Sequence, residues 1–239
     1  MKTESLQRPG VLTIFTIAAP HIDFLSTALS LGLSTRWRRA VVEHPAIRKG
    51  GKILDVCTGT GELALPMAEN LGPDGQVVGI DFCRDMLALA KEKARARANS
   101  HPLRVSFGVS DARSLEFPDD SFDAVTVAFG MRNIPDNTVA LREIKRVLKP
   151  GGTFLCLELT RPDRRWFLPF YRLYAFGVMP RVGKLITRSN EPYSYLPASI
   201  FGFCSPEEFR QVIEGCGFAS VKAHPMTFGV ATIYEATKG

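Results

Sequence analysis

A carboxylate beside a glycine turn is the first feature of the chain that could do chemistry. Residues 53–61 form a short apolar run that contains Asp55 and then breaks into a turn carrying Gly59 and Gly61. Glycines in such a turn allow positive φ and let a ligand lie against bare backbone. A buried strand that runs into a glycine turn and a helix start is where α/β sheets hold nucleotide cofactors. Because Gly59-x-Gly61-x-x-Ala64 also fits the dinucleotide fingerprint, the turn alone supports several cofactors.

The charge beside this turn favours a cationic ligand over one that carries phosphates. A dinucleotide would place its pyrophosphate near Asp55, whereas S-adenosylmethionine (SAM) carries an ammonium and a sulfonium that a carboxylate attracts. Asp81 ends the next expected strand, Gln76–Asp81, where an acid can accept hydrogen bonds from both ribose hydroxyls. NAD and SAM enzymes both use such an acid, so Asp81 indicates an adenosine and Asp55 selects SAM. The plainer alternative is that Asp55 only caps the following loop or helix.

Further side chains are placed to hold an adenine ring. Phe82 and Met86 open the helix after the second strand and could press on the face of the ring, or could equally be core. Asp111 follows an expected strand over 103–109 and can accept from the adenine amino group, with the small Ala112 beside the ring. Asp111 could instead simply end its loop.

A polar pair follows the fourth expected strand, at 122–129. Arg132 and Asn133 come just after its carboxyl end, outside the central crevice of the sheet. Such residues are costly at this position unless something polar lies there.

Composition limits the class of protein. A chain of 239 residues with 45% hydrophobic residues fits one globular α/β domain. No run of about 18–20 unbroken apolar residues is present, and the N-terminus lacks a secretory layout, so we expect a cytoplasmic protein. The five cysteines are scattered without a CxxC pair, which argues against a disulfide framework or a metal site. The net charge of +6 comes without a nucleic-acid-binding signature.

The elements expected around these residues alternate between strands and helices. This order predicts a Rossmann-like α/β fold with a mostly parallel seven-stranded sheet, helices on both faces and an antiparallel closing strand. We expect a single domain over 1–239, with an N-terminal helical cap over about 11–45 and an inserted apolar helical cover over about 162–200. The cap carries apolar residues at helical spacing, which is typical of a helix that packs against the core. In this position the cap could also cover a substrate cavity.

Residues 161–188 contain WFLPFYRLYAFGVMP, flanked by arginines. This density of aromatic and aliphatic residues predicts a cover over an oily substrate that also touches the membrane interface. The alternative is a helix packed into the core or against a second subunit, as in a homodimer.

Three segments resemble the ubiquinone/menaquinone biosynthesis C-methyltransferases of the UbiE/MenG type. They are ILDVCTGTGELA, FGMRNIPD and ALREIKRVLKPGGTFLCLELTRP, and the similarity extends over about 15–238. The resemblance implies the class I methyltransferase fold and cofactor contacts at Thr60, Asp81, Asp111, Ala112 and Ala128. It also implies methyl transfer to a ring carbon of a prenylated hydroquinone, with Asp23, Phe129 and Tyr195 on the substrate side.

The implied reaction is direct displacement at the sulfonium methyl. A hydroquinone carbon becomes nucleophilic when the neighbouring hydroxyl loses its proton, and it must be held in line at about 3 Å. Arg132 can stabilise the phenolate, and Asn133 can orient a water that takes the proton. The chain has Ile22 and Ser26 where the family usually carries Tyr and Asn, so another small or lipophilic acceptor is the alternative. An NAD-type oxidoreductase is the competing class.

Overall fold

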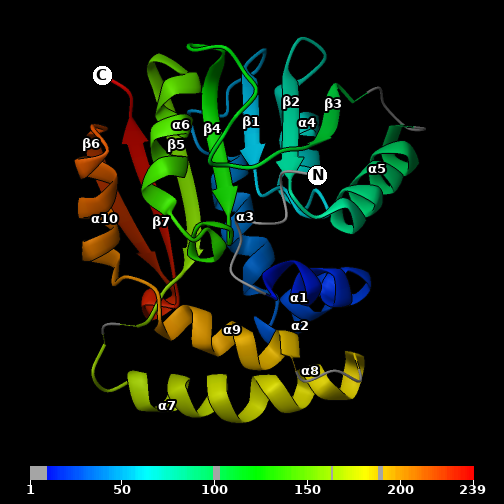
Figure 1. Ribbon diagram of the computed structural model, residues 1–239, viewed down its shortest axis with the longest axis vertical. Coiled ribbons are helices and arrows are strands. Elements are labelled where there is room, and N and C mark those ends of the chain that lie inside the picture. Colours follow the sequence, from blue (N-terminus) through cyan, green and yellow to red (C-terminus); the bar gives the residue numbers. More distant parts are fainter. Residues whose placement is uncertain (1–9, 99–102, 163, 188–190) are drawn as a thin grey trace.

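A seven-stranded sheet forms the centre of the computed structural model, which describes residues 10–98, 103–162, 164–187 and 191–239 (Figure 1). Its order is β3-β2-β1-β4-β5-β7-β6, and β7 alone runs antiparallel to its neighbours β5 and β6. The strands are β1 Lys52–Val56, β2 Gln76–Asp81, β3 Val105–Val109, β4 Phe122–Ala128, β5 Leu148–Leu159, β6 Ala219–Met226 and β7 Ala231–Thr237. The predicted fold class is confirmed.

Both faces of the sheet are buried along β1, β2 and β4, which explains the continuous apolar runs of these parallel strands. Alternate residues of β1 enter different cores, since Ile53 packs with α3 and α4 whereas Leu54 packs with α6 and α10. The helices that flank the sheet are α3 Leu33–Val42, α4 Ala64–Leu71, α5 Arg84–Ala98, α6 Asn137–Val147 and α10 Pro206–Gly215.

The N-terminal cap is divided into short helices rather than one long helix followed by a second near Trp37. It comprises α1 Val11–Ala18, the 3₁₀ turn η2 Ala19–His21, α2 Ile22–Leu29 and α3, which begins at Leu33. Gly32 adopts a left-handed conformation (φ 79°) before α3, so the chain turns there. The cap therefore bends around the carboxyl ends of the strands instead of crossing them in one direction.

One helical run among the described residues, Val11–Leu29, is long and apolar enough by length and composition to cross a membrane, with a mean hydropathy of 1.4. This corrects the expectation that no segment qualifies. The expectation required an unbroken apolar run. Pro20, His21 and Asp23 interrupt this run, but its mean hydropathy stays high enough for a membrane-spanning helix. In this structure Leu25 and Leu29 pack against Ala175 and Met179 of the cover.

The cover lies beyond the carboxyl ends of the strands, below the cap in Figure 1. It consists of α7 Leu168–Leu173, the π-helical turn η4 Tyr174–Val178, α8 Met179–Thr187 and α9 Glu191–Phe201. Strands β1, β2 and β4 point toward these helices and toward α1 and α2. Residues at or just after the ends of β1, β2, β3, β4 and β5 line one cavity together with residues of these helices.

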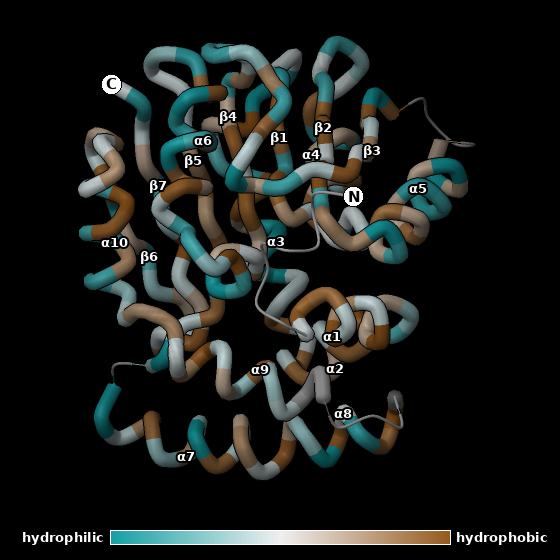
Figure 2. The backbone as a smooth tube through the Cα atoms, viewed as in Figure 1, coloured by the Kyte–Doolittle hydropathy of each residue, from teal (hydrophilic) through white to brown (hydrophobic). Residues whose placement is uncertain are grey.

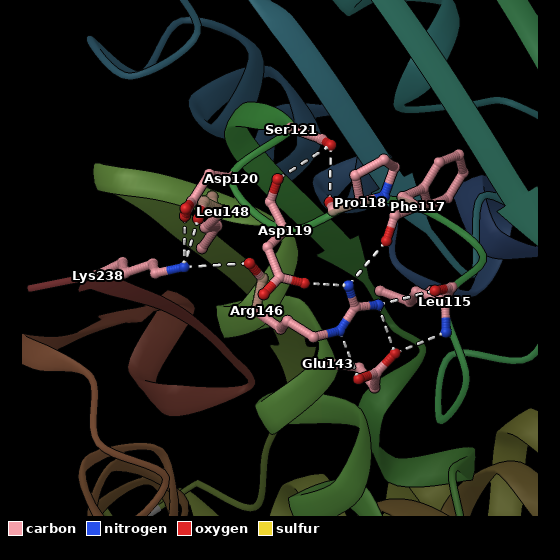
Figure 3. A network of polar contacts seen from close by, with 10 residues as sticks. All are labelled: Leu115, Phe117, Pro118, Asp119, Asp120, Ser121, Glu143, Arg146, Leu148 and Lys238. Carbon is pink, nitrogen blue, oxygen red and sulfur yellow. Dashed lines mark hydrogen bonds and ion pairs between the residues drawn. The ribbon is translucent and has the colours of Figure 1, made fainter.

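A polar network at the opposite end of the sheet fixes the loop between β3 and β4 (Figure 3). The guanidinium of Arg146 on α6 donates to the carbonyl oxygens of Leu115 and Phe117, each at 2.8 Å. It also pairs with Asp119 and with Glu143, whose carboxylate in turn accepts from the Leu115 amide. These bonds hold the loop that enters β4.

Candidate active site

A cavity of about 560 Å³ lies at the carboxyl ends of the parallel strands. Pockets of this size are typical of small-molecule and cofactor sites. Nearly all the site residues expected from sequence line it: Asp23, Asp55, Gly59, Thr60, Asp81, Phe82, Met86, Asp111, Ala112, Ala128, Phe129, Arg132, Asn133 and Tyr195. Gly61 does not line it. Its φ of 80° turns the chain, and a Cβ there would lie 3.3 Å from Leu65 and Phe107.

Asp55 is 1% exposed, and hydroxyl groups satisfy both of its oxygens. Thr58 donates to one oxygen at 2.6 Å and Thr126 donates to the other at 2.6 Å. Burial raises the pKa of Asp55 to about 6, although the two hydroxyl donors oppose the shift. The bond to Thr58 shows that Asp55 does hold the glycine loop, as the plainer reading proposed. The residue also places a desolvated carboxylate on the cavity wall.

Asp81 ends β2 with its carboxylate held by backbone amides. The amide of Gly59 donates to one oxygen at 2.9 Å, and the amide of Cys83 donates to the other at 2.9 Å. Burial raises the pKa of Asp81, while these backbone donors oppose the shift. A carboxylate oxygen can accept more than one hydrogen bond, so Asp81 keeps acceptor capacity for a ribose.

Asp111 forms an ion pair that sequence reasoning did not anticipate. Arg113 donates to its two oxygens at 3.1 Å and 2.7 Å. Partial burial alone would raise the pKa of Asp111, but the bonds and charge of Arg113 outweigh it and lower the pKa. Beside this pair, the buried hydroxyl of Ser110 lies on the cavity wall and has no hydrogen-bond partner among the residues that the structure describes. At this position the Ser110 hydroxyl could form a hydrogen bond with a polar edge of a bound ring.

Phe82 and Met86 belong both to the cavity wall and to a small core. They pack with Ala19 and Cys83, and the ring of Phe82 meets Phe15 edge-on at 6.1 Å. The cap therefore closes over this end of the cavity.

Arg132 forms a buried ion pair with Glu158 at the end of β5. Its Nη1 lies 2.5 Å from a Glu158 oxygen and also donates to the carbonyl of Phe129 at 2.6 Å. Its Nε donates to Ser199 on α9 at 3.3 Å. Glu158 is fully buried. The pair joins two strand ends to the cover, and the remaining nitrogen, Nη2, makes no hydrogen bond to any residue the structure describes.

Asn133 and Tyr195 meet across the cavity. The Tyr195 hydroxyl donates to the Asn133 side-chain oxygen at 2.9 Å, and the Asn133 amide donates to the Phe129 carbonyl at 3.1 Å. Phe129 itself has a φ of 62°, an unusual backbone conformation for an aromatic residue and one that clusters at functional sites. These contacts join Tyr195 on α9 to Asn133 and Phe129, which lie much earlier in the sequence.

Asp23 ties the cap to the glycine loop. It accepts from Thr60 at 2.6 Å and pairs with Lys93 at 2.5 Å, and Lys93 also pairs with Glu62 at 2.7 Å. The side chain expected to face the substrate is thus engaged in a network that positions α2.

Sequence reasoning missed Arg38, Arg113, Glu158 and Ser199 as parts of the site. Glu158 could have been found, because it ends the fifth strand as Asp81 ends the second. Arg38 lies in a basic run on α3 that looks like a solvated face. None of the described histidines lines the cavity.

The strand order, the glycine loop after β1 and the acid at the end of β2 define a Rossmann-like α/β fold with a site for an adenosine cofactor at the strand ends. A SAM-dependent methyltransferase from Aquifex aeolicus is similar, with a TM-score of 0.63 and 20% identity over 84% of this chain and 89% of that one. The [4+2]-cyclase SpnF has a TM-score of 0.70 and 20% identity over 95% and 94%. At such low identity these likenesses show the fold alone.

The chain belongs to the ubiE/COQ5 methyltransferase family, whose model matches residues 1–238. The ubiquinone/menaquinone biosynthesis C-methyltransferase UbiE of Geobacter sulfurreducens is 40% identical over 226 residues, 95% of this chain and 87% of that protein. The demethylmenaquinone methyltransferase of Staphylococcus aureus strain Newman is 40% identical over 238 residues, 100% and 97%. The resemblance seen in the motifs is confirmed, and membership sets aside the NAD-type oxidoreductase.

The residues of the cavity fit SAM. Five carboxylates and three guanidiniums line it, namely Asp23, Asp55, Glu62, Asp81, Asp111, Arg38, Arg113 and Arg132. The excess of negative charge complements a ligand that carries both a sulfonium and an ammonium. Asp81 and the orphaned Ser110 hydroxyl provide hydrogen-bonding groups for the adenosine.

Protonation of Asp55 should weaken SAM binding at low pH. Its pKa near 6 lies above the ordinary value, so the carboxylate loses its charge as the pH falls through 6. If binding requires the charged form, SAM affinity drops about tenfold from pH 7 to pH 5. Isothermal titration calorimetry at several pH values would measure this. Asp55→Asn should bind SAM weakly and with a flat pH profile over the same range. Equal pH dependence in the wild type and the variant would contradict the assignment.

Proposed function

We propose that this chain transfers a methyl group from SAM to a ring carbon of a prenylated hydroquinone in the synthesis of a respiratory quinone. The observation that carries the proposal is that one cavity joins two chemically different walls. Acids at the strand ends form one wall, and apolar side chains of the cap and cover form the other, among them Leu25, Leu29, Phe167, Tyr171, Met179 and Leu196. A cationic methyl donor and a lipophilic methyl acceptor can therefore bind next to each other in this cavity. Relatives named for ubiquinone, menaquinone or demethylmenaquinone support this acceptor class.

Residues at the junction of the two walls suit deprotonation of a phenol. When bound, SAM supplies an electrophilic methyl group. Arg132 lines the cavity, and the bonds of its Nη1 and Nε to Glu158 and Ser199 hold its guanidinium in place. A guanidinium held in this way stabilises the negative charge that develops on a phenolate oxygen. The hydrogen-bonded pair Asn133–Tyr195 can orient a water that accepts the phenol proton.

Ile22 and Ser26, which stand where the family resemblance leads us to expect Tyr and Asn, both lie on the cap side of the cavity wall. The Ser26 hydroxyl accepts from Arg38 at 3.3 Å, so it takes part in the site's polar contacts. A methyltransferase for another lipophilic acceptor is therefore the second candidate.

Transfer of a labelled methyl group to a lipid extract would identify the acceptor. We expect the label in a prenylated hydroquinone, with fragmentation in the mass spectrometer placing it on a ring carbon. Asp81→Ala is the matched control, because it removes the group assigned to the ribose and should abolish both binding and transfer. Label recovered only in a different compound would favour the second candidate.

Loss of Arg132 should affect turnover far more than cofactor binding. Arg132→Ala would leave the buried Glu158 charge uncompensated, so Arg132→Met should be combined with Glu158→Gln to protect the fold. We expect the double variant to lose about 10²- to 10³-fold in kcat while S-adenosylhomocysteine affinity stays within about threefold. Single-turnover kinetics and calorimetry measure the two quantities. Arg142→Ala, an exposed arginine on α6, serves as the control. Normal turnover in the double variant would refute the role given to Arg132.

The outer face of the cover exposes apolar side chains that a soluble surface rarely gathers. Phe170 and Leu173 on α7 are 67% and 72% exposed, and Leu185 on α8 is 83% exposed. Trp166, Phe176 and Val178 are exposed as well, and α7 and α8 alternate between hydrophobic and hydrophilic residues (Figure 2). Basic residues lie among them, including Arg164, Arg165, Arg172, Arg181 and Lys184.

This combination supports peripheral contact with an anionic membrane surface on the cytoplasmic side. Exposed aromatic side chains insert at the interface, and arginines attract acidic headgroups. The same helix also lines the cavity, since Phe170 and Tyr171 on α7 belong to its wall. Contact of the cover with a membrane would therefore bring the cavity close to an acceptor dissolved in the bilayer.

Liposome flotation should show binding that depends on both kinds of residue. We expect the protein to float with vesicles that contain acidic lipid, and to float less at high salt because screening weakens the charge attraction. The double variant Leu173→Ser/Leu185→Ser should lose flotation, whereas Val109→Ser, an exposed apolar residue on β3, should not. A protein that stays out of the lipid and sediments as a dimer would show that a second copy covers this face instead.

A further inference from the structure

Arg38 differs in its charge partners from the other two cations on the cavity wall. Arg113 is paired with Asp111 at 2.7 Å and Arg132 is paired with Glu158 at 2.5 Å. Within the described residues, Arg38 has no carboxylate within the 4 Å that defines an ion pair. Its contacts are a 3.3 Å hydrogen bond from Nη2 to the Ser26 hydroxyl and the face of the Phe129 ring at 5.1 Å.

A partly buried guanidinium without an ion-pair partner is unfavourable unless a ligand completes it. Burial lowers the pKa of Arg38, and the more distant charges of Glu62, Asp23 and Asp55 only partly oppose the shift. Removing a charge from water costs free energy that a paired anion can offset. The site therefore offers an anion-binding group on a wall that is otherwise rich in carboxylates.

The strand order shows which part of the cofactor reaches Arg38. The sheet runs β3-β2-β1-β4, with the adenine residue Asp111 after β3 and the ribose residue Asp81 at the end of β2. The amino-acid part of SAM must then extend across β1 toward the end of β4. Phe129 follows β4, and the Arg38 guanidinium lies over its ring.

We propose that Arg38 binds the α-carboxylate of the methionine portion of SAM. This assignment rests on the SAM site described above and not on the identity of the acceptor. A guanidinium and a carboxylate form charge-assisted, often bidentate hydrogen bonds. With the carboxylate held by Arg38, the ammonium of the same amino acid is left to the carboxylates nearby, Asp55 above all. Arg38 would thereby set how far the sulfonium reaches toward the acceptor wall.

The test compares two ligands that differ only in this carboxylate. S-adenosylhomocysteine carries it, and decarboxylated S-adenosylhomocysteine, which keeps the thioether and the amine, lacks it. Calorimetry without any acceptor measures both affinities in the wild type, in Arg38→Met and in Arg38→Lys. Arg36→Met, which removes an exposed charge two residues away on α3, is the matched control.

We expect Arg38→Met to weaken S-adenosylhomocysteine binding by about 10- to 100-fold and to leave the decarboxylated ligand within about twofold of the wild type. Arg38→Lys should show a smaller loss for S-adenosylhomocysteine alone, and it provides the comparison if Arg38→Met does not fold. In the wild type, the decarboxylated ligand should bind more weakly than S-adenosylhomocysteine. Arg36→Met should change neither affinity.

Other results would overturn the proposal in identifiable ways. Unchanged S-adenosylhomocysteine affinity in Arg38→Met would mean that Arg38 faces a different anion, such as the acceptor phenolate. Equal losses for both ligands would mean that Arg38 only shapes the pocket. If neither ligand binds the wild-type protein, the SAM site itself is wrongly placed, whereas an error in the acceptor leaves all these measurements untouched.

Discussion

Charge removed from water at one edge of the sheet is the constraint on which the rest of this structure depends. Parallel strands bring their carboxyl ends together, and here those ends carry acids that the covering helices desolvate. Each acid is stabilised by a different group: hydroxyls hold Asp55, backbone amides hold Asp81, and guanidiniums hold Asp111 and Glu158. The loops between strands and helices take the shapes that these bonds require.

The ion pair between Arg132 and Glu158 connects the chemistry to the cover. Glu158 belongs to β5, Arg132 follows β4, and Ser199 brings α9 to the same guanidinium. A second contact from α9, the Tyr195 hydroxyl on Asn133, lies beside it. Because Ser199 and Tyr195 both belong to α9, a shift of this helix would change the orientation of Arg132 and Asn133 together. The cover therefore contributes polar contacts to the cavity wall as well as apolar ones.

The sheet and the covering helices contribute different walls of the cavity. Solved structures with the same fold include a methyltransferase and a cyclase, so the sheet alone does not determine the reaction. In this chain the strand ends carry the groups that suit SAM, whereas the cap and cover supply the wall that an acceptor would meet. Ile22 and Ser26 lie on the cap side of the cavity, where Ile22 packs with the cluster that contains Met86 and Ser26 accepts a hydrogen bond from Arg38.

The order of strands and helices, the glycine loop and the acids at the strand ends could be derived from the sequence, because they depend on local patterns of apolar residues, glycines and charges. The family resemblance added Thr60, Ala128 and Tyr195, and all three line the cavity. Local sequence patterns could not predict contacts between distant segments. Examples are the contacts of Asp23 with Lys93, of Asn133 with Tyr195 and of Arg132 with Glu158. Such pairs depend on which elements meet at the sheet edge. The chain by itself thus determined the cofactor half of the site, while only tertiary packing decided which charges are compensated, and it left Arg38 without an ion-pair partner among the described residues.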